Sequence, residues 1–329
     1  MRYSVTGATG LLGNNVVRHL LDLGHEVRVS VRRSSNRTPL EDLDVEILEG
    51  EIGESDHADR LVAGTQALIH AAGMIWFGKT QQKRSHKTNV EASHNLAEAC
   101  ARHGSRLLFV SSTDALAAGS PSQPANESSL HPAKCNAAYV LSKRQAESTL
   151  LENAPNIDLD VVIVNPCLFF GPWDWKPSSG KMILALTDGF VPMAPSGGIS
   201  VGDVRNIAKG IVAAAQRGQH GQRYILAGTN LSYLELWRYI AGLVDRKGPI
   251  AAMRTPMKKI LSFGGDLYTR LSKRETEINS EAIKLGACWN FYDSSKAVNE
   301  LGYETGDYKT AIQDAWDWLR ANGYSKHKP

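Results

Sequence analysis

The sequence predicts an α/β protein built on a doubly wound parallel β-sheet, followed by a smaller C-terminal α/β lobe. Short runs rich in Val, Ile and Leu alternate with helical patterns through the first half of the chain, as in a parallel sheet covered on both faces. A glycine-rich turn joins the first run to the first helix. This regularity decreases after Pro166, and residues 171–198 are rich in Gly, Pro, Trp and Met. The lobe is therefore expected to begin near residue 171.

The order of the elements follows from the spacing of apolar residues. Apolar runs predict strands over residues 3–6, 27–31, 45–48, 67–71, 106–110, 159–164, 199–204 and 223–226. Helical spacing predicts helices over residues 11–23, 89–102 and 137–151, and Gly24 ends the first of them. We expect residues 1–170 to form a nucleotide-binding domain and residues 171–329 mainly a substrate-binding lobe, with segments near 199–226 returning to the core.

Composition and charge exclude several classes of protein. The chain has 329 residues, of which 42% are apolar and 22% charged, as is ordinary for a globular protein. Its 37 Lys and Arg against 34 Asp and Glu give no basis for binding nucleic acid or a membrane surface. No apolar run is long enough to span a membrane, and the first residues do not resemble a signal peptide. We expect a soluble, cytoplasmic protein.

The four cysteines lie far apart in the sequence and none forms a Cys-x-x-Cys pair. In a chain of this length they predict reduced, mostly buried thiols, with no disulfide framework and no metal site. They are Cys100, Cys135, Cys167 and Cys288.

The turn after the first predicted strand contains three glycines in the spacing Gly-x-x-Gly-x-x-Gly. One glycine permits a tight turn, one lets the backbone approach a pyrophosphate, and one lets the helix pack closely on the strand. The free N–H groups and the positive dipole end of the helix favour phosphates. An ordinary tight turn between strand and helix is the alternative. We expect a dinucleotide to be bound here by Gly7, Thr9, Gly10, Leu11, Leu12 and Gly13.

The end of the second predicted strand indicates which dinucleotide is bound. NAD enzymes usually place an acidic residue there for the ribose 2′-hydroxyl, but this chain has Arg32 and Arg33. A guanidinium suits a 2′-phosphate through charge-assisted hydrogen bonds. The two arginines therefore favour NADP(H) as cofactor; a solvated basic turn, with NAD as cofactor, is the alternative.

The pattern Tyr-x-x-x-Lys occurs at three places, Tyr139/Lys143, Tyr292/Lys296 and Tyr324/Lys328. About half a match is expected by chance in a chain of this composition, so context must separate them. The first pair opens a predicted helix, and an i,i+4 pair faces one way, here toward the carboxyl edge of the sheet where ligands bind. The second pair lies at the start of a later helix, and the third near the end of the chain. We expect only the first pair to form a site.

These motifs together resemble those of the extended short-chain dehydrogenase/reductases, which have a Rossmann-type fold. The resemblance spans nearly the whole length, and its motifs occur in the expected order: TGATGLLG, Ser111-Ser112, Tyr139/Lys143, and Asn165-Pro166 followed by Gly171-Pro172. The segments NPCLFFGP and YDSSKAVNELGY are similar to the dihydroflavonol-4-reductase-like branch, which includes 3β-hydroxysteroid dehydrogenases and hopanoid-associated sugar epimerases. The chain departs from the family at Leu116-Ala117-Ala118, where Val-Tyr-Gly is usual, and at Gly50-Glu51, where Gly-Asp is usual. The first departure leaves the substrate class open.

The resemblance implies that Ser112, Tyr139 and Lys143 are catalytic. A phenol with a pKa of about 10 transfers protons poorly at neutral pH, and a neighbouring ammonium and the cationic nicotinamide favour the phenolate and lower that pKa. Lys143 would do this for Tyr139 and would hold the nicotinamide ribose, while Ser112 would hydrogen-bond the substrate oxygen. Tyr139 would give or take the hydroxyl proton as hydride passes between substrate and nicotinamide. Ser111 and Thr113 are the competing candidates for the serine role.

Further cofactor contacts are implied by the same resemblance. They involve Glu51, Ile52, Ala71, Ala72, Gly73, Ser111, Pro166 and Phe169, besides Tyr139 and Lys143. Asn89 resembles the asparagine of the family's fourth helix, for which a structural role and a proton relay are the two alternatives.

Aromatic and methionine side chains follow the fourth and sixth predicted strands, whose carboxyl ends should open on one crevice. They predict an apolar or ring-shaped substrate, and packing between the two parts of the chain is the alternative. The candidate substrate contacts are Met74, Trp76, Thr113, Trp173 and Trp175. Arg205 and Arg223 are candidates for binding a diphosphate, with surface or structural ion pairs as the alternative.

The leading hypothesis is an NADP(H)-dependent oxidoreductase that interconverts a ketone and a secondary alcohol on a mostly apolar or ring-shaped small molecule. A nucleotide-sugar epimerase or dehydratase is the alternative, and the Tyr139/Lys143 pair argues against a non-catalytic NADP-binding sensor. By analogy with the family, we also expect a homodimer formed through the helices 89–102 and 137–151. Its apolar face would consist of Ala92, Leu96, Leu141 and Leu150, which could instead face the sheet.

Overall fold

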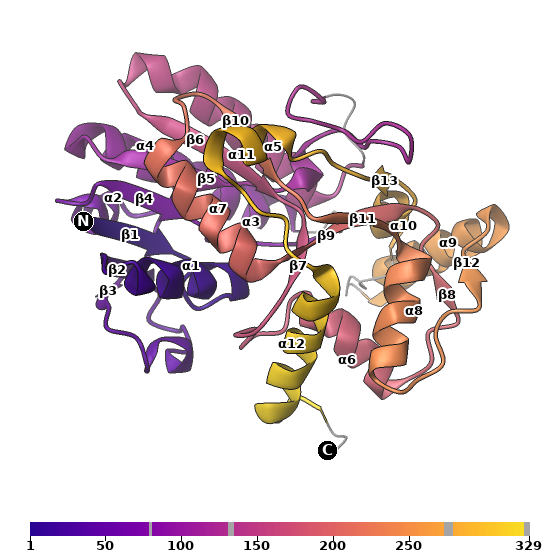
Figure 1. Cartoon of the computed structure of the whole chain (residues 1–329). Coiled ribbons are helices and arrows are strands. Elements are labelled where there is room, and N and C mark those ends of the chain that lie inside the picture. The colour runs from indigo at the N-terminus through magenta and orange to yellow at the C-terminus, as the bar shows by residue number, and fades with distance from the viewer. Residues whose placement is uncertain (79–80, 131–134, 273–278, 326–329) are drawn as a thin grey trace.

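The computed structural model describes residues 1–78, 81–130, 135–272 and 279–325, with only the backbone for residues 267–272. Its main feature is a seven-stranded sheet in the order β10-β6-β5-β4-β1-β2-β3 (Figure 1). Every strand pairing in this sheet is parallel. The strands are β1 (Arg2–Thr6), β2 (Glu26–Val31), β3 (Glu46–Glu49), β4 (Ala67–His70), β5 (Arg106–Val110), β6 (Val161–Pro166) and β10 (Arg223–Leu226).

The strand order determines where a ligand is expected. From β1 the chain builds β2 and β3 on one side, and then crosses to build β4, β5 and β6 on the other. In doubly wound sheets, ligands bind at this reversal, outside the carboxyl ends of the strands. The carboxyl ends of β1 and β4 therefore mark the expected cofactor site.

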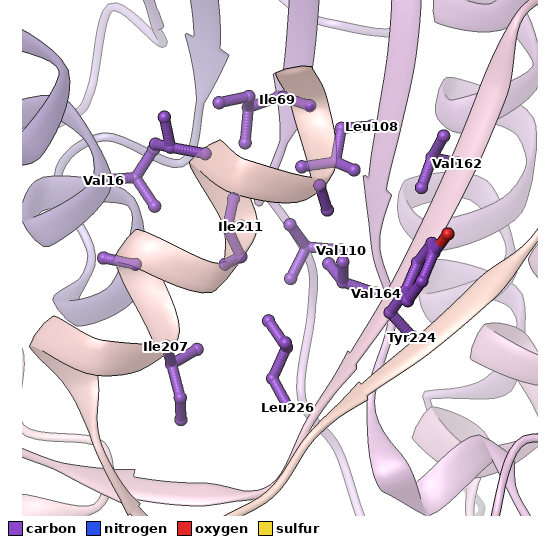
Figure 2. Close-up of a cluster of buried hydrophobic side chains, with 14 of the residues drawn as sticks. Val16, Ile69, Leu108, Val110, Val162, Val164, Ile207, Ile211, Tyr224 and Leu226 are labelled. Carbon is purple, nitrogen blue, oxygen red and sulfur yellow. The ribbon is translucent and has the colours of Figure 1, made fainter. Parts of the chain in front are cut away.

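Helices cover both faces of the sheet, because its strands bury side chains on both sides. On one face lie α1 (Leu11–Asp22), α7 (Val204–Arg217) and α11 (Ser295–Leu301), and on the other α2 (Ser55–Val62), α4 (Ala92–His103) and α5 (Ala138–Asn153). Figure 2 shows the first of these cores, in which Val16 and Ile211 project toward Ile69, Leu108, Val110, Val162 and Val164.

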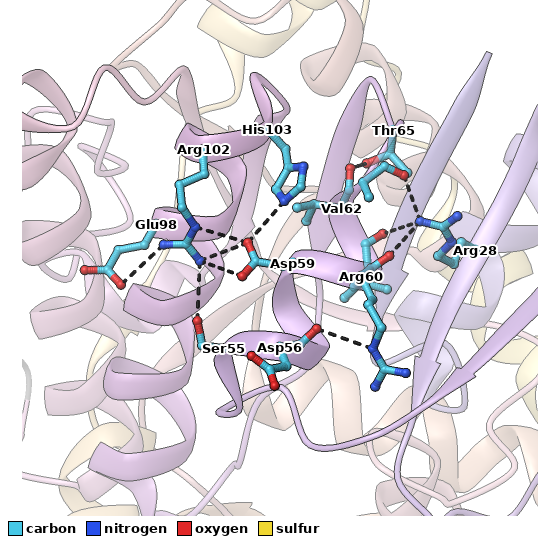
Figure 3. A network of polar contacts seen from close by, with 12 residues as sticks. Arg28, Ser55, Asp56, Asp59, Arg60, Val62, Thr65, Glu98, Arg102 and His103 are labelled. Atoms are coloured by element: carbon cyan, nitrogen blue, oxygen red, sulfur yellow. Dashed lines mark hydrogen bonds and ion pairs between the residues drawn. The ribbon is translucent and has the colours of Figure 1, made fainter.

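Charged groups connect α2 to its neighbours (Figure 3). The guanidinium of Arg28 on β2 donates to three carbonyls at the end of α2, those of Arg60, Leu61 and Ala63. A cation at a helix C-terminus is stabilised by the helix dipole. On the other side of α2, Asp59 accepts from Arg102 of α4 at 2.9 Å. These contacts fix α2, which the periodicity of apolar residues did not predict.

The remaining elements form the C-terminal lobe. In its main sheet, β9 (Gly198–Asp203) pairs with β7 (Leu168–Phe170), β11 (Thr229–Ser232) and β13 (Trp289–Asn290). A second, two-stranded sheet consists of β8 (Met193–Ala194) and β12 (Ala251–Ala252). The helices of the lobe are α6 (Gly180–Asp188), α8 (Tyr233–Leu243), α9 (Thr255–Ser272), α10 (Ser280–Gly286) and α12 (Tyr308–Ala321). Figure 1 shows α9 and β12 at the end of the molecule opposite β2 and β3.

The structure confirms the predicted fold class, and the strands over 106–110 and 223–226 have the predicted bounds. The two segments expected to return to the core differ: β10 becomes the edge strand of the parallel sheet, whereas β9 lies in the sheet of the lobe. The helix expected from residue 89 begins at Ala92, after the short helix α3 (Gln82–His86) and a π-helical turn over Lys87–Glu91. Short 3-10 turns cover Thr38–Leu40, Thr113–Ala115 and Ala154–Asn156. A domain boundary near residue 170 stays a prediction.

Among the helices that the structure describes, none is long and apolar enough to cross a bilayer.

Candidate active site

The glycine turn between β1 and α1 packs against the end of β4. Gly7 has a φ of 77°, a conformation that L side chains rarely adopt. A Cβ atom at Gly7 would lie 2.8 Å from backbone atoms of both Ala71 and Ala72. At Gly13, a Cβ atom would collide with the carbonyl oxygen of Gly7. The close packing of turn, helix and strand therefore requires glycine at both positions.

The N-terminus of α1 has the features of a phosphate site. Gly10 is its N-cap residue, and no side chain caps the helix. The N–H groups of the first turn, which begins with Leu11 and Leu12, consequently face the space beyond the turn together with the positive end of the helix dipole. An uncapped helix N-terminus beside a tightly packed glycine turn fits the pyrophosphate of a dinucleotide.

Arg32 and Arg33 follow β2 at the same edge of the sheet, and both are exposed. In the described part of the chain, neither guanidinium takes part in an ion pair or a hydrogen bond, although Arg37 nearby pairs with Glu49. Both cations are therefore available to a phosphate. The other expected contact at this edge, Glu51, is exposed as well.

Tyr139 and Lys143 occupy the first two turns of α5 and are both buried. The Nζ atom of Lys143 donates to the carbonyl of Val110 at 2.8 Å, which fixes the ammonium at the carboxyl end of β5. A Cβ atom at Gly73 would lie 3.3 Å from this Nζ atom. The ring of Tyr139 packs edge-on against Phe77, with 5.9 Å between the ring centroids. The pair thus lies beside the segment that follows β4, as the resemblance implies.

The electrostatics of the pair differ from the sequence-based expectation. Burial raises the pKa of Tyr139, and the carboxylate of Asp114 acts in the same direction, whereas a hydrogen bond from Ser112 opposes both. Burial also lowers the pKa of Lys143 to about 8, although the negative charge of Glu147 favours its ammonium form. Desolvation of Tyr139 therefore opposes the lowering of the phenol's pKa that was expected from Lys143 and the cationic nicotinamide. That lowering stays a prediction for the enzyme with its cofactor bound.

Ser112 is the serine that reaches Tyr139. Its Oγ atom also accepts from the backbone N–H of Asp114 at 3.0 Å and caps the turn that follows β5. The Oγ atom of Ser111 is buried and, within the described part of the chain, has no hydrogen-bond partner. An unsatisfied buried hydroxyl at a strand end is consistent with a bound molecule that completes its hydrogen bonding, so the two serines suit the substrate and cofactor roles assigned to them.

Asn89 connects the segment after β4 to α5. Its amide oxygen accepts from the N–H of Met74 at 2.7 Å, and its Nδ2 atom donates to the carbonyl of Met74 and to Ser142, each at 2.9 Å. All of these contacts position backbone or a hydroxyl beside Lys143. They favour the structural alternative for Asn89.

A chain of hydrogen bonds connects Asn89 to the carboxyl ends of β1 and β4. The N–H of Ala72 donates to Thr6 Oγ1 at 3.1 Å, Thr6 Oγ1 lies 2.7 Å from His70 Nδ1, and His70 Nε2 lies 3.0 Å from Ser93. Ser93 donates to the carbonyl of Asn89 at 2.9 Å. Because burial lowers the pKa of His70 to about 3, the ring is neutral, and the chain assigns its proton to Nε2.

A buried carboxylate beneath the site is absent from the sequence-based prediction. Glu147, one turn beyond Lys143 on α5, accepts from Asn165 at 2.7 Å and from Arg223 at 2.8 Å. Asn165 in turn donates to the carbonyl of Ser112 at 3.0 Å. Glu147 lies four residues after Lys143 and thus on the same helix face, and this spacing could have indicated its position from the sequence.

The other two Tyr-x-x-x-Lys pairs do not form comparable sites. The hydroxyl of Tyr292 donates to the carbonyl of Thr113 at 2.8 Å, while Lys296 Nζ points elsewhere and donates to Gln222 at 2.7 Å. Tyr324 donates to the carbonyl of Trp175 at 2.6 Å, and Lys328 lies outside the described residues. Tyr292 was expected only at a helix start, but it also holds the turn that carries Ser112.

The candidate substrate residues fall into two groups. Met74, Trp76 and Thr113 lie beside the candidate catalytic residues, and the carbonyl of Trp76 accepts from the N–H of Tyr139 at 3.0 Å. Trp173 and Trp175 instead belong to an aromatic cluster with Trp318 and Tyr324, and the guanidinium of Arg18 lies 3.4 Å above the ring of Trp173. This cluster favours a packing role for the two tryptophans, and their contact with substrate stays a prediction.

The remaining cofactor candidates lie near the carboxyl edge of the main sheet, as their positions relative to the predicted strands indicate. Pro166 ends β6 and is buried, Phe169 lies in β7 and packs on the core of the main sheet, and Ile52 packs on the core under α2 and α4. Thr9 lies within the glycine turn. The structure brings these residues to the same end of the sheet.

The two candidate diphosphate arginines already pair with carboxylates. Arg205 contacts Asp203 at 2.6 Å and Asp314 at 2.7 Å, and Arg223 contacts Glu147 at 2.8 Å. These contacts favour structural ion pairs over a diphosphate site.

The apolar face proposed for a dimer is wrong in most of its residues. Ala92, Leu96 and Leu150 are buried within the single chain, where Leu96 and Leu150 belong to the core between the helices and the sheet. Leu141 is the exposed member of the four. The helical spacing could not distinguish the inward from the outward face.

Comparison with known proteins agrees with this geometry. A model of the NAD dependent epimerase/dehydratase family matches residues 3–227. A Synechocystis sp. protein named "Putative dihydroflavonol 4-reductase" is 32% identical over 98% of this chain and 96% of its own length. "Sterol demethylase protein B" of Methylococcus capsulatus is 28% identical over 97% of this chain and 98% of its own length. The solved structure of a nucleoside-diphosphate-sugar epimerase from Pseudomonas aeruginosa is 28% identical and has a TM-score of 0.82, over 99% of each chain. The chain belongs to the NAD-dependent epimerase/dehydratase family.

Proposed function

We propose that this NAD(P)-dependent oxidoreductase uses NADP(H) to interconvert a ketone and a secondary alcohol on a mostly apolar, ring-shaped small molecule. The observation that carries the proposal is the cluster of Ser112, Tyr139 and Lys143 at the carboxyl edge of the sheet, beside an uncapped helix that follows a glycine turn. A proton donor, an oxygen-binding hydroxyl and a cation are the groups that reduction of a carbonyl requires.

The cofactor preference is inferred from the two unpaired arginines. Arg32 and Arg33 follow β2 where the adenosine ribose lies in this fold, and a guanidinium binds a 2′-phosphate through two parallel hydrogen bonds. When bound, the nicotinamide cofactor would supply or accept the hydride. Lys143 would hold the ribose through its ammonium, which is already positioned by the carbonyl of Val110.

The proton transfer is inferred for Tyr139. In the reduction direction, Ser112 would donate a hydrogen bond to the substrate oxygen, and the phenol of Tyr139 would give that oxygen its proton. The ammonium of Lys143 would then stabilise the phenolate. The phenol of Tyr139 is protonated at neutral pH. Because burial raises its pKa, release of the proton would require the ammonium of Lys143 and the bound cofactor to favour the phenolate.

The substrate class rests on the relatives and on the residues near Tyr139. Two relatives that cover nearly the whole chain are named for a dihydroflavonol and a sterol, which are both ring-shaped and mainly apolar. Met74, Trp76 and Phe77 offer apolar surface on the segment beside Tyr139. We also infer a cytoplasmic location, which the four free thiols support.

The test is a panel of substrates followed by NADPH absorbance and product analysis. Dihydroflavonols and 3-ketosteroids form one arm, and nucleotide sugars form the other. We expect one molecule of NADPH to be consumed for each ketone reduced. Conversion of a nucleotide sugar to its epimer without net NADPH consumption would contradict the proposal and establish the epimerase instead.

The NADP preference has its own test. Arg32→Ala and Arg33→Ala should each weaken NADPH binding while leaving NADH binding nearly unchanged, as measured by calorimetry. Arg37→Ala, which removes a nearby arginine already paired with Glu49, is the matched control. An unchanged NADPH/NADH affinity ratio in both single variants would overturn this part of the proposal.

We further propose a homodimer, formed through the outer faces of α4 and α5, which pack side by side. Leu141, exposed on α5, would lie in this interface. Light scattering at micromolar concentration should report twice the chain mass, and Leu141→Glu should lower it. A monomer in the wild type would refute the proposal.

A further inference from the structure

Large apolar side chains are exposed unevenly over the molecule. Of the eleven that lie exposed in the described part of the chain, five come from one region of the lobe: Phe190, Ile250, Met257, Ile260 and Phe263. Ile260 and Phe263 are 66% and 71% exposed, and Ile250 is 73% exposed. Single exposed apolar residues are ordinary, but a concentration in one region indicates a binding surface.

The solvent-facing side of α9 is apolar. Successive residues of a helix are rotated by about 100°, so Ile260 and Phe263 point to the same side. Lys258, Leu261 and Ser262 point to the other side and are partly buried. A surface helix ordinarily turns its apolar side chains toward the core. In α9, by contrast, Ile260 and Phe263 face the solvent.

A neighbouring strand pair extends this surface. The N–H of Ile250 donates to the carbonyl of Pro192 at 3.0 Å, at the start of the pairing between β12 and β8. Phe190, 55% exposed, lies two residues before Pro192. Since α9 begins three residues after β12, the strand pair and the helix form one continuous end of the lobe (Figure 1).

The charge of this segment is positive, unlike that of the whole chain. Residues 245–266 contain five Lys and Arg against two Asp, whereas the full sequence has 37 against 34. Lys247, Arg254 and Lys259 are exposed. The near-neutral composition therefore concealed a local excess of cations beside the exposed apolar residues.

We propose that α9 and the β8–β12 strand pair form a surface that binds an anionic phospholipid bilayer. Ile260 and Phe263 would enter the boundary between headgroups and acyl chains, and Arg254 and Lys259 would contact headgroup phosphates. Interfacial helices combine an apolar side with flanking cations in this way. A second copy of the chain is a poorer occupant, because a two-fold contact brings the same cations of both copies to one interface.

Two hydrogen bonds connect α9, through α10, to the segment that precedes the candidate catalytic helix α5. Asp266 of α9 accepts from the N–H of Ser280 at 3.1 Å, and Glu281 of α10 accepts from the N–H of Asn136 at 2.7 Å, three residues before Tyr139. Binding of α9 to a bilayer would therefore attach the membrane, where apolar molecules accumulate, to an element that is connected to the start of α5. This consequence rests on the proposed function, but the docking itself does not.

Sedimentation with vesicles tests the docking without any assay of activity. Vesicles of phosphatidylcholine with an equal share of phosphatidylglycerol should bind the wild-type chain, and added salt should weaken binding. Ile260→Ser/Phe263→Ser should lower the partition coefficient about tenfold or more, since two apolar side chains no longer leave water. Lys259→Glu should lower it about fivefold or more on these vesicles and much less on phosphatidylcholine alone.

The control removes two exposed apolar side chains elsewhere, in Leu23→Ser/Val298→Ser, and should bind as the wild type does. NADPH affinity, measured in parallel, should be the same in all variants as in the wild type, which would confirm that they are folded. If the wild type itself does not bind NADPH, the proposed cofactor is wrong, but the proposed docking is not affected. Wild-type protein that stays in the supernatant would overturn the proposal. So would equal binding by Ile260→Ser/Phe263→Ser, or a change from dimer to monomer in that variant with no change in vesicle binding.

Discussion

Tyr139/Lys143 and Tyr292/Lys296 have the same spacing in the sequence but different surroundings in the structure. In the first pair both residues lie on α5, both are buried, and Ser112 hydrogen-bonds the phenol. In the second pair Tyr292 lies before α11, whereas Lys296 lies within that helix and its ammonium donates to Gln222.

The Tyr-x-x-x-Lys spacing therefore brings the two side chains to one site only when a single helix at a strand end carries both residues. Tyr292 is buried too, and its hydroxyl reaches the carbonyl of Thr113, next to Ser112. Two tyrosines thus contact the same turn. We propose that Tyr139 offers its hydroxyl to a substrate, whereas Tyr292 donates its hydroxyl proton to the backbone.

The largest effect should separate the two lysines. Lys143→Met removes the cation that stabilises the phenolate, so turnover should fall by about 10²–10⁴-fold, as for the loss of an acid–base group. NADPH affinity should fall as well. Steady-state kinetics and calorimetry measure the two effects.

Lys296→Met is the matched control for this change. Its ammonium contacts Gln222 and the carbonyl of Arg223, so turnover should remain close to wild type. Equal losses of turnover in the two variants would erase the distinction between the pairs.

A second effect concerns the carboxylate beneath Lys143. Because the charge of Glu147 favours the ammonium of Lys143, whose pKa is about 8, Glu147→Gln should make Lys143 lose its proton at lower pH. Turnover needs the ammonium and therefore falls as the pH rises. In Glu147→Gln this fall should begin at a lower pH than in the wild type. A pH profile of turnover measures this, and a purely structural role would lower the profile without moving it.

Glu300→Gln supplies the comparison, because Glu300 accepts from Tyr224 on β10 and does not contact the site. Its pH profile should match that of the wild type. A profile of Glu147→Gln that keeps the wild-type position would contradict the assigned positioning role.

The fold and the position of the candidate catalytic residues were predictable from the sequence because they depend on local patterns. Apolar runs gave the strands, and the glycine turn and the Tyr139/Lys143 spacing are contained within single elements. Glu147 and Tyr292 were missed because their roles depend on Asn165, Arg223 and Thr113, which only the tertiary fold brings near. The exposed side of α9 was missed because its apolar spacing resembles that of a helix packed on a core.

A smaller effect should appear in stability, from the structural tyrosine. Tyr292→Phe leaves the buried carbonyl of Thr113 without its 2.8 Å donor, so the free energy of unfolding should fall by about 1–3 kcal/mol. Urea denaturation measures the change. Tyr239→Phe, which removes a more exposed hydroxyl bonded to the Lys309 carbonyl, should cost less, and the reverse order would argue against the role of Tyr292.

The last effect, a dependence of stability on pH, should come from the hydrogen-bond chain that connects Thr6, His70 and Ser93 to Asn89. His70 has a folded pKa of about 3, lowered from 6.5 by burial, so below pH 6.5 the unfolded chain binds the extra proton first. Stability should therefore fall as the pH drops from 6.5 toward 3, by up to about 1.4 kcal/mol per pH unit from this group. Urea denaturation at several pH values should show a shallower dependence for His70→Asn than for the wild type and for His94→Asn, a change at the surface of α4. Parallel dependences in all three would contradict the neutral, buried state of His70.

The central claim is that Tyr139, and not Tyr292, transfers the proton. It is tested most directly by measuring turnover of Tyr139→Phe and Tyr292→Phe side by side on the same ketone with NADPH. We expect Tyr139→Phe to lose about 10²–10⁴-fold in turnover while still binding NADPH, and Tyr292→Phe to stay close to wild type. Full turnover in Tyr139→Phe, or a loss of that size in Tyr292→Phe alone, would contradict it.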